Sequence, residues 1–485
     1  MRNRTVTATI ILLISLFCFH ALGEEMMCFE AENGHFSGKT GTGSENGITF
    51  VTGFAQDDDS VEIPVTVNKS GFYDIVFNLR SQDGGYKENY VLADGENVGT
   101  VKAEGKQWQE QSVEYVYLAA GEHSITVRKF WGWIQIDSLQ MIPSTPLPDD
   151  LYEIEPLLVN PDASGEARSL MTYLCSIYGK AVLSGQYCDE GMYGAENATI
   201  WRATGGKYPA MLGLDLIEYS PSRVAHGAKG KTVDLALDYW DKGGIVTFCW
   251  HWNAPEKYIT GPWYSAFYTD SCNLNLAAVM DGRDPEGYEL LMEDIDAIAA
   301  QLLRLKEAGV PVLWRPLHEA SGGWFWWGAA GHEAYLKLYR LLYDRLTNEY
   351  GLNNLIWVWN GQDADWYPGD EYVDIIGEDI YPGEQVYTSQ AARFIKAMRY
   401  TDAKKMITLS ENGCLPDPEL LFRDGIVWSY TGTWGGEFVM KNKTYNILSE
   451  QYTDEQMLRK FYTSDLVITR DELPDLKNGV GLNKE

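Results

Sequence analysis

Two glutamates lie at the ends of apolar runs of the chain, where a carboxyl group could carry chemistry. Glu319 ends the run VPVLWRPLHE (310–319), and Glu411 lies near the end of KMITLSEN (405–412). Hydrolysis of a glycosidic bond needs such a pair. One carboxylic acid protonates the leaving oxygen, and a carboxylate across the sugar attacks carbon or activates water. Aromatic neighbours would raise the pKa of Glu319, as a general acid requires, and polar neighbours would keep Glu411 ionised.

Residues near the two glutamates could hold a substrate. Arg315 and Tyr381 are candidates to hold the Glu411 carboxylate. Trp324 and Trp434 are expected to stack on the C–H faces of a pyranose ring, because indole offers a flat apolar surface. The other two indoles of the WFWW stretch are expected to pack inside the protein.

Other classes of catalysis find no support in the sequence. The chain has 7 histidines and no HExxH motif, which disfavours metal catalysis. It has no P-loop, no dinucleotide-binding motif and no GxSxG nucleophile motif. We therefore expect no catalytic cofactor.

Both glutamates belong to a region in which apolar runs alternate with helical patterns. The runs are continuous, as fits parallel strands covered on both faces. They span residues 180–187, 208–216, 243–252, 310–319, 354–361, 373–381, 405–412 and 425–434. Residues 286–309 and 332–351 have apolar side chains at helical spacing. Eight strand signals alternating with helices predict a (β/α)8 TIM barrel. The alternative, a doubly wound open sheet, lacks a GxGxxG motif after its first strand.

In such a barrel the chemistry lies at the carboxyl ends of the strands. The runs end in polar or aromatic residues, among them His251, Asn360 and Asp379. Strands four and seven face each other across the mouth of a barrel. The positions of Glu319 and Glu411 are therefore compatible with a retaining pair of carboxyl groups, which lie about 5–5.5 Å apart.

Several segments together resemble family 26 of the glycoside hydrolases, chiefly endo-β-1,4-mannanases. They are CWHW (249–252), WRPLHE (314–319), GEDIYPG (377–383), LSENG (409–413) and the late Trp434. The resemblance implies Glu319 as acid/base and Glu411 as nucleophile of a retaining enzyme. Its substrate would be the β-mannosidic bonds of mannan, galactomannan or glucomannan. The resemblance also implies substrate-binding or catalysis-supporting roles for His251, Arg315, His318, Trp324, Asp379, Tyr381 and Trp434.

Two alternatives stay open. The same barrel could act on mixed-linkage β-glucan or β-1,3-xylan, because recognition of an axial or equatorial O2 depends on a few polar contacts. The chain could also be a catalytically dead surface glycan-binding protein, although such a protein need not keep both glutamates. The segment 253–286, with Trp263 and Tyr264, would govern the choice of substrate.

A different pattern precedes the barrel. Residues 28–142 contain short runs of alternating apolar and polar residues, separated by Gly, Asn and Asp. This pattern predicts an all-β sandwich of jelly-roll type. The Pro-rich stretch PSTPLPDD (143–150) marks a linker. We therefore divide the chain into a β-sandwich over 24–142, a linker over 143–164 and a (β/α)8 glycoside hydrolase domain over 165–485.

Two features of the sandwich could bind ligands. Glu30 and Glu32 lie two residues apart, so a strand would place both on one face. Together with Asp137 they could hold a hard cation such as calcium, or they could be solvated acids. Trp131 and Trp133 of the FWGW stretch could stack on a sugar or lie at the edge of the core.

The sandwich resembles a family 35 carbohydrate-binding module. The resemblance rests on FEAEN (29–33), NLRSQDGGYKENYVLADG (78–95) and GWIQIDSLQMI (132–142). It implies a structural calcium ion held by Glu30, Glu32 and Asp137. It also implies sugar binding by the loops that carry Trp131, Trp133 and Asn89.

The amino-terminal residues predict export. A basic start, MRNR, precedes the apolar stretch ATIILLISLFCFHALG (8–23), which predicts a secretory signal peptide over 1–23. A membrane anchor would need about 20 apolar residues and is the weaker interpretation. We expect a secreted, periplasmic or cell-surface protein with no membrane-spanning segment after removal of the signal. Export permits disulfides, but the cysteine spacing does not give their pairing.

The charge of the chain restricts its partners. A formal net charge of −30 disfavours nucleic acid and anionic membranes, because both require basic patches. A neutral polysaccharide fits this charge, and by the resemblance it would be β-mannan. No feature of the sequence indicates an oligomer, so we expect a monomer.

Overall fold

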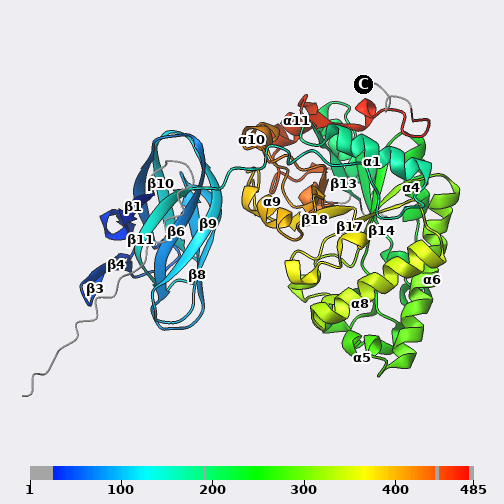
Figure 1. The fold of residues 1–485 in the computed structure, drawn as a ribbon, viewed down its shortest axis with the longest axis horizontal. Helices are drawn as coiled ribbons and strands as arrows, with labels where there is room; N and C mark the ends of the chain where they lie inside the picture. The colour runs from blue at the N-terminus through cyan, green and yellow to red at the C-terminus, as the bar shows by residue number, and fades with distance from the viewer. Residues whose placement is uncertain (1–25, 189–192, 443–446, 480–485) are drawn as a thin grey trace, which may run out of the picture. The chain divides into compact units, whose positions relative to one another are not determined.

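The computed structural model describes residues 26–188, 193–442 and 447–479, and it divides the chain into a unit ending at Thr145 and a unit beginning at Pro146 (Figure 1). The signal peptide predicted over 1–23 lies outside the described residues. Among the described helices, none is long and apolar enough to cross a membrane. Within the same residues, no disulfide joins the cysteines.

The first unit confirms the predicted sandwich: two antiparallel sheets form its two layers (Figure 1). One sheet has the order β3 (Gly41–Glu45), β4 (Ile48–Thr52), β11 (Ile134–Pro143), β6 (Gly71–Ser81), β9 (Gln109–Leu118), and β1 (Met27–Glu30) also pairs with β11. The other has the order β2 (His35–Ser37), β5 (Ser60–Val67), β10 (Gly121–Lys129), β7 (Lys87–Ala93), β8 (Glu96–Ala103). Buried and exposed side chains alternate along β5, because successive side chains of a strand point to opposite faces.

The second unit confirms the predicted barrel. Its closed sheet contains, in order, β13 (Gly185–Tyr187), β14 (Met211–Asp215), β15 (Ile245–Trp250), β16 (Val312–Pro316), β17 (Leu355–Trp359), β18 (Ile375–Ile380), β19 (Met406–Asn412) and β20 (Thr431–Thr433). Each of the eight predicted runs contains one of these parallel strands. All residues of β15 through β19 are buried, since side chains fill the barrel and helices cover it.

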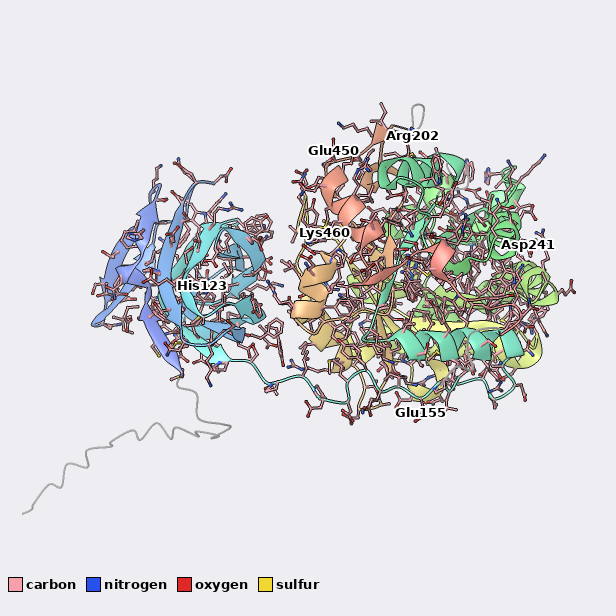
Figure 2. All side chains as sticks on the ribbon, turned by 90° about the horizontal axis from the view of Figure 1, so that it is seen from above. His123, Glu155, Arg202, Asp241, Glu450 and Lys460 are labelled. Atoms are coloured by element: carbon pink, nitrogen blue, oxygen red, sulfur yellow. The ribbon has the colours of Figure 1, made fainter. Side chains whose placement is uncertain are left out.

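Helices surround the strands of this unit (Figure 1). The longer ones are α1 (Gly165–Ile177), α2 (Tyr193–Thr204), α4 (Thr232–Asp241), α6 (Pro285–Glu307), α8 (His332–Tyr343), α9 (Ala391–Met398) and α11 (Glu455–Thr463). Local sequence explains the limits of α6: Asp284 caps it by accepting from the Gly287 N–H, and Pro285 occupies its first turn. Charged side chains cover the outside of the unit, where Glu155, Arg202, Asp241 and Glu450 are exposed (Figure 2).

Most of the segment predicted as a linker, 143–164, packs onto the barrel unit. The Tyr152 hydroxyl donates to the Gly425 carbonyl at 2.5 Å, and the Val159 N–H donates to Asp374 Oδ1 at 2.7 Å. Ser164 then caps α1 by accepting from the Ala167 N–H. These bonds anchor residues 152–164, which follow the Pro-rich stretch 143–150, to the barrel unit.

Candidate active site

Three carboxylates meet at the mouth of the barrel. Glu319 follows β16, the fourth strand, Asp379 lies in β18, and Glu411 lies in β19, the seventh strand. One oxygen from each of the three lies within 4.8 Å of the others. The structure therefore brings the two predicted catalytic carboxyl groups together at a separation close to that of a retaining pair, and well below the roughly 6.5–9.5 Å of an inverting pair.

Both oxygens of Glu411 accept hydrogen bonds. Arg315 Nη2 donates to Oε2 at 2.5 Å, and the Tyr381 hydroxyl donates to Oε1. Burial and the nearby Asp379 carboxylate raise the pKa of Glu411, whereas Arg315 and the Tyr381 hydrogen bond act in the opposite direction. The polar surroundings predicted for Glu411 are thus present, but burial outweighs them and the pKa of Glu411 is raised to about 8, so the prediction that they keep it ionised is not supported.

Arg315 is fully buried beneath this pair. Besides Glu411 it contacts Asp379 Oδ2 through Nη1 at 2.7 Å, and Nη1 also donates to Asn360 Oδ1 at 3.2 Å. Asp379 is buried as well and accepts from the Ser410 hydroxyl at 2.7 Å. A buried guanidinium is tolerable only when it is paired in this way. Arg315 therefore holds two carboxylates and does not line the surface that a substrate would meet.

Glu319 lies in a strained turn. Its φ is +52° and that of Leu317 is +51°, in the left-handed region that side chains with a Cβ rarely adopt. Each such residue costs roughly 1–3 kcal/mol and tends to occur at functional sites. The Glu319 N–H donates to the Asn360 carbonyl at 2.8 Å, which helps to hold the turn.

One indole covers the Glu319 carboxyl group. Trp324 Nε1 donates to Glu319 Oε2 at 3.0 Å, and the Trp324 side chain is otherwise open, with 45% of the residue exposed. A Cβ at Gly322 would meet this ring at 2.0 Å, so the Ser-Gly-Gly hinge makes room for it. Burial, followed by the charge of Asp379, raises the pKa of Glu319 to about 7. The desolvation predicted from the aromatic neighbours is therefore present.

The two predicted histidines, His251 and His318, are in contact, but only His251 lines a cavity. His251 follows β15 and lines a cavity of about 470 Å³, whereas His318 is buried with its ring edge against that of His251. The two Nε2 atoms are 3.2 Å apart. His318 therefore touches the cavity only through His251, and this position differs from a direct sugar contact.

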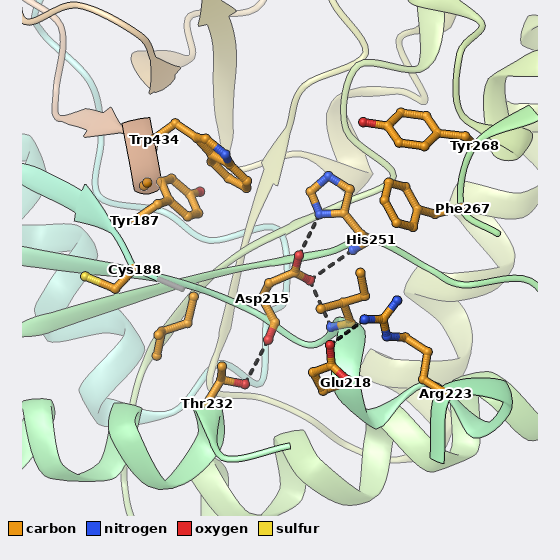
Figure 3. Close-up of a pocket in the computed structure, with 14 residues that line it drawn as sticks. Tyr187, Cys188, Asp215, Glu218, Arg223, Thr232, His251, Phe267, Tyr268 and Trp434 are labelled. Atoms are coloured by element: carbon orange, nitrogen blue, oxygen red, sulfur yellow. Dashed lines mark hydrogen bonds and ion pairs between the residues drawn. The ribbon is translucent and has the colours of Figure 1, made fainter. Parts of the chain in front are cut away.

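Figure 3 shows the cavity that His251 lines, and Glu319 and Glu411 are not among its lining residues. Trp434, predicted to floor it, lines it and packs against Tyr187 with ring centroids 5.0 Å apart. Phe267 and Tyr268, from the segment predicted to govern substrate choice, line it too. Aromatic faces with a few polar groups between them are typical of a site for sugar rings.

Three lining residues of this region were not predicted from the sequence. The Tyr187 hydroxyl accepts a hydrogen bond from Arg315 Nε at 3.2 Å. Tyr268 lines the cavity. Asp215 Oδ2 lies 2.6 Å from His251 Nδ1. Asp215 and Tyr187 each end a barrel strand, so the strand-end position was a signal that could have found them. The predicted interior packing of Trp326 and Trp327 is confirmed, since both are buried.

In the sandwich, the FWGW stretch forms an exposed aromatic loop. Trp131 is 55% exposed and Trp133 is 46% exposed. Gly132 between them has a φ of +72°, and a Cβ there would meet the Phe54 carbonyl oxygen at 2.1 Å. Asn89 is buried: its Oδ1 accepts from the N–H groups of Phe130 and Gly132 at 3.0 Å each. Asn89 thus shapes this loop rather than reaching a ligand at its surface.

Of the predicted calcium ligands, Glu30 ends β1, but Glu32 lies in the 3-10 turn Ala31–Asn33, so the two do not share the face of one strand as predicted; Asp137 comes from β11. Burial and the charges of Asp137 and Glu32 raise the pKa of Glu30. Glu32 Oε2 is buried without a hydrogen-bond partner among the described residues, and Asp137 Oδ2 accepts from Asn78 Nδ2 at 2.9 Å. A buried carboxylate oxygen that lacks a partner is what a bound cation would satisfy.

Comparisons with known proteins match both units. The family profile described as "Glycosyl hydrolase family 26" matches residues 159–472, and that described as "Carbohydrate binding module (family 35)" matches residues 27–144. A mannan endo-1,4-beta-mannosidase of Thermothelomyces thermophilus is 40% identical over 451 residues, which cover 92% of this chain and 90% of that protein. Mannan endo-1,4-beta-mannosidase B of Piromyces sp is 32% identical, covering 96% of this chain and 80% of that protein.

A solved structure resembles the whole chain. The crystal structure of a GH26-CBM35 beta-(1,4)-mannanase of Podospora anserina has 36% sequence identity and a TM-score of 0.65, and the match covers 93% of this chain and 99% of that chain. These similarities extend over both units. The chain belongs to glycosyl hydrolase family 26 and carries a family 35 carbohydrate-binding module ahead of its barrel.

Proposed function

We propose that the protein is a retaining endo-β-1,4-mannanase that hydrolyses mannan, galactomannan or glucomannan by double displacement. The observation that carries this proposal is that one carboxylate oxygen of Glu319 lies within 4.8 Å of one of Glu411. That separation leaves one sugar linkage between the two groups and too little room for a water on the opposite face. The relatives named above supply the class of substrate.

The hydrogen bonds of the two glutamates support different roles. Glu411 accepts from a guanidinium and a hydroxyl, which favour its anion, whereas among the described residues Glu319 accepts from the Trp324 indole. Burial and the Asp379 charge raise the pKa of both carboxyl groups, so the assignment of roles rests on these hydrogen bonds and not on the pKa values. This distribution makes Glu319 the general acid and Glu411 the nucleophile.

The reaction then proceeds in two displacements. Glu411 attacks the anomeric carbon while Glu319 gives its proton to the leaving glycosidic oxygen, so that a glycosyl ester forms and the shortened chain departs. Glu319, now a carboxylate, takes a proton from water, which attacks the same carbon and releases Glu411. Two inversions at one carbon leave the β configuration unchanged.

Neighbouring residues orient these groups and the substrate. Arg315 and Tyr381 hold Glu411 in one rotamer, and Asp379 balances the charge of Arg315. Trp324 and Trp434 would offer ring faces to the sugars on either side of the cleaved bond, and His251 lines the same cavity as Trp434. Hydrolysis by this arrangement uses no cofactor.

Mixed-linkage β-glucan and β-1,3-xylan are the competing substrates, and a catalytically dead glycan-binding protein is the competing function. The catalytic pair is intact and its carboxylates are hydrogen-bonded, which argues against a dead site. The deciding measurement is release of reducing ends from mannan, mixed-linkage β-glucan and β-1,3-xylan, with NMR of the first anomer formed. Hydrolysis of mannan with initial β-anomer is expected, and absence of mannan hydrolysis or an initial α-anomer would contradict the proposal.

The sandwich is proposed to bind β-mannan through Trp131 and Trp133, in the loop that Asn89 holds. Glu30, Glu32 and Asp137 would hold a calcium ion there, which would stabilise the fold without taking part in hydrolysis. Calcium added to the EDTA-treated protein should raise the melting temperature of the sandwich, and should not do so in Glu32→Ala. An equal rise in both proteins would count against this site.

The chain is further proposed to be exported through residues 1–23, with release of a monomer that starts near Glu24. The support is the order of basic, apolar and small residues at the amino terminus. Amino-terminal sequencing and light scattering of the exported protein test both points. A chain that still began at Met1, or a dimer mass, would contradict them.

A further inference from the structure

Three side chains from consecutive barrel strands form a hydrogen-bonded row beside the catalytic pair. Asp215 ends β14, His251 follows β15, and His318 follows β16. Asp215 Oδ2 lies 2.6 Å from His251 Nδ1, and His251 Nε2 lies 3.2 Å from His318 Nε2. The first of these bonds is drawn in Figure 3, where the Asp215 carboxylate points at the imidazole ring of His251.

The contacts of Asp215 fix which nitrogen of His251 carries the proton. Asp215 Oδ1 accepts from the backbone N–H groups of His251 at 3.0 Å and Ile217 at 2.9 Å. A backbone N–H can only donate, so the direction of these two hydrogen bonds is fixed. An ionised carboxylate only accepts, and His251 must therefore present Nδ1–H to Oδ2. In the neutral ring Nε2 then has no proton, and it can only accept from its neighbour.

The same logic extends to His318. Because His251 Nε2 accepts, His318 must donate from its own Nε2–H, which leaves His318 Nδ1 without a proton. Nδ1 is buried and has no hydrogen-bond partner in the described part of the chain. A proton on Nδ1 would thus be a buried donor with nothing to bind, a rare and costly state. Burial, Arg315 and His251 also lower the pKa of His318, so that ring is neutral.

We propose that Asp215 is a positioning residue for catalysis, which sets the tautomers of His251 and His318 and thereby holds the strained turn that carries Glu319. The proposal rests on the proposed function, since it concerns the general acid of that reaction. It gives His318 a role through its neighbours, in place of a direct contact with sugar.

Several bonds hold the backbone of the turn around Glu319: Trp327 Nε1 donates to the His318 carbonyl at 2.9 Å, and the Glu319 N–H donates to the Asn360 carbonyl at 2.8 Å. The His318 ring packs against Phe325 and Trp327, and within the described residues its ring hydrogen bond is the one to His251. Left-handed backbone on both sides of His318 persists only when its surroundings determine it. Loss of the ring contact should therefore displace the carboxyl group of Glu319.

The conservative substitution Asp215→Asn keeps the shape of the side chain but changes the tautomer that it imposes on His251. The amide oxygen must take the place of Oδ1, because the two backbone N–H groups require an acceptor. The NH2 group then faces His251 Nδ1 and forces it to lose its proton. His251 would donate from Nε2, and His318 would carry an unpartnered Nδ1–H. An equivalent replacement next to the histidine of a serine protease triad preserves geometry and lowers kcat by roughly 10⁴-fold, because it imposes the wrong tautomer.

The first test reads the tautomers without any substrate. In the full-length protein labelled with ¹⁵N-histidine, we expect a protonated Nδ1 for His251 and a protonated Nε2 for His318, with signals assigned through single His→Gln variants. In Asp215→Asn both patterns should invert. A wild-type spectrum with His251 unprotonated at Nδ1 would overturn the proposal, even if the variant proved too unstable to purify.

The second test measures catalysis with two leaving groups. A dinitrophenolate leaves without protonation, so general acid catalysis matters for mannotetraose and little for dinitrophenyl β-mannobioside. Asp215→Asn should lower kcat/KM at least 30-fold on mannotetraose and less than 5-fold on the aryl substrate. Equal losses on both substrates, or full activity on both, would refute a role through Glu319.

A matched control is available in Asp294→Asn. Asp294 is a buried aspartate on α6 that accepts from Trp252 Nε1 at 2.7 Å, away from the catalytic pair. Asp294→Asn should keep wild-type kinetics and both histidine tautomers. If Asp294→Asn also lost activity, the loss in Asp215→Asn could not be assigned to the histidine row. If the wild-type protein hydrolyses neither substrate, the proposed hydrolase function is wrong, while the histidine spectra still decide whether the row exists.

Discussion

Arg315 Nη2 lies 2.5 Å from Glu411 Oε2, and both side chains are buried at the bottom of the barrel mouth. The same guanidinium reaches Asp379 at 2.7 Å through its other terminal nitrogen. A planar, permanently charged guanidinium presents separate terminal nitrogens to the two carboxylates in a fixed geometry, whereas a lysine offers a single nitrogen. The Arg315 charge favours the ionised form of Glu411 and so opposes the effect of burial on its pKa.

Arg315→Lys is therefore expected to lower kcat on mannan at least 100-fold. The single lysine nitrogen does not reproduce the two separate contacts of the guanidinium, and breaking a buried ion pair typically costs about 3–5 kcal/mol. A lower melting temperature should accompany the kinetic loss. Kinetics and thermal unfolding of this variant check both effects, and a variant with near-normal kcat would show that Glu411 does not depend on the pair.

Glu319→Ala should lose at least 1,000-fold in kcat on mannan and regain turnover of an aryl mannoside when azide is added. Azide can enter the space left by the carboxyl group and attack the glycosyl ester, so the product should be β-mannosyl azide. Glu411→Ala serves as the comparison, because it cannot form the ester and should yield no β-azide. The reverse pattern would exchange the two roles.

At alkaline pH, the loss of activity, which forms the alkaline limb of the pH profile, should reflect deprotonation of Glu319. Burial raises the pKa of this carboxyl group to about 7. A general acid acts in its protonated form, so kcat/KM should fall as the pH rises through that value. Trp324→Phe removes a donor that favours the anion, and it should move this limb to higher pH. Trp263→Phe, which alters an indole stacked on His226, should leave the limb in place. A limb unmoved by Trp324→Phe would contradict this hydrogen bond.

Asp294 should make the protein less stable as the pH rises. Burial raises its pKa from 3.8 to about 7, so between these values the folded state holds a proton that the unfolded state has lost. The free energy of unfolding therefore falls with rising pH across this window. Asp294→Asn cannot ionise and still accepts from Trp252, so its melting temperature should fall less between pH 4 and pH 8 than that of the wild type. An equal fall in both proteins would contradict the shift.

The aromatic loop of the sandwich should hold the enzyme on insoluble mannan. The double variant Trp131→Ala and Trp133→Ala should lose at least tenfold in retention on a mannan affinity gel while hydrolysing soluble mannan at the normal rate. Phe36→Ala, which removes another exposed aromatic ring of the same unit, is the control and should bind normally. Normal retention of the double variant would place sugar binding elsewhere.

The sequence predicted the elements of the fold well, because the relevant signals are local. Continuous apolar runs and alternating runs reflect burial on two faces or on one, and each of the eight long runs contains a barrel strand. The glutamates could be placed for the same reason, since a charge at the end of a buried strand must lie at the mouth. Asn89 was placed less well, because an asparagine that shapes a loop and one that binds a sugar look alike in sequence.

Only the tertiary structure decided which partners these residues have. Asp215, His251 and His318 are separated by dozens of residues and meet because β14, β15 and β16 are neighbours in the closed sheet. Arg315 reaches Glu411 across the inside of the same barrel. Hydrophobic patterning along a chain records how much of each residue is buried. It does not record which strand end lies beside which, and hydrogen bonds and pKa values depend on that arrangement in space.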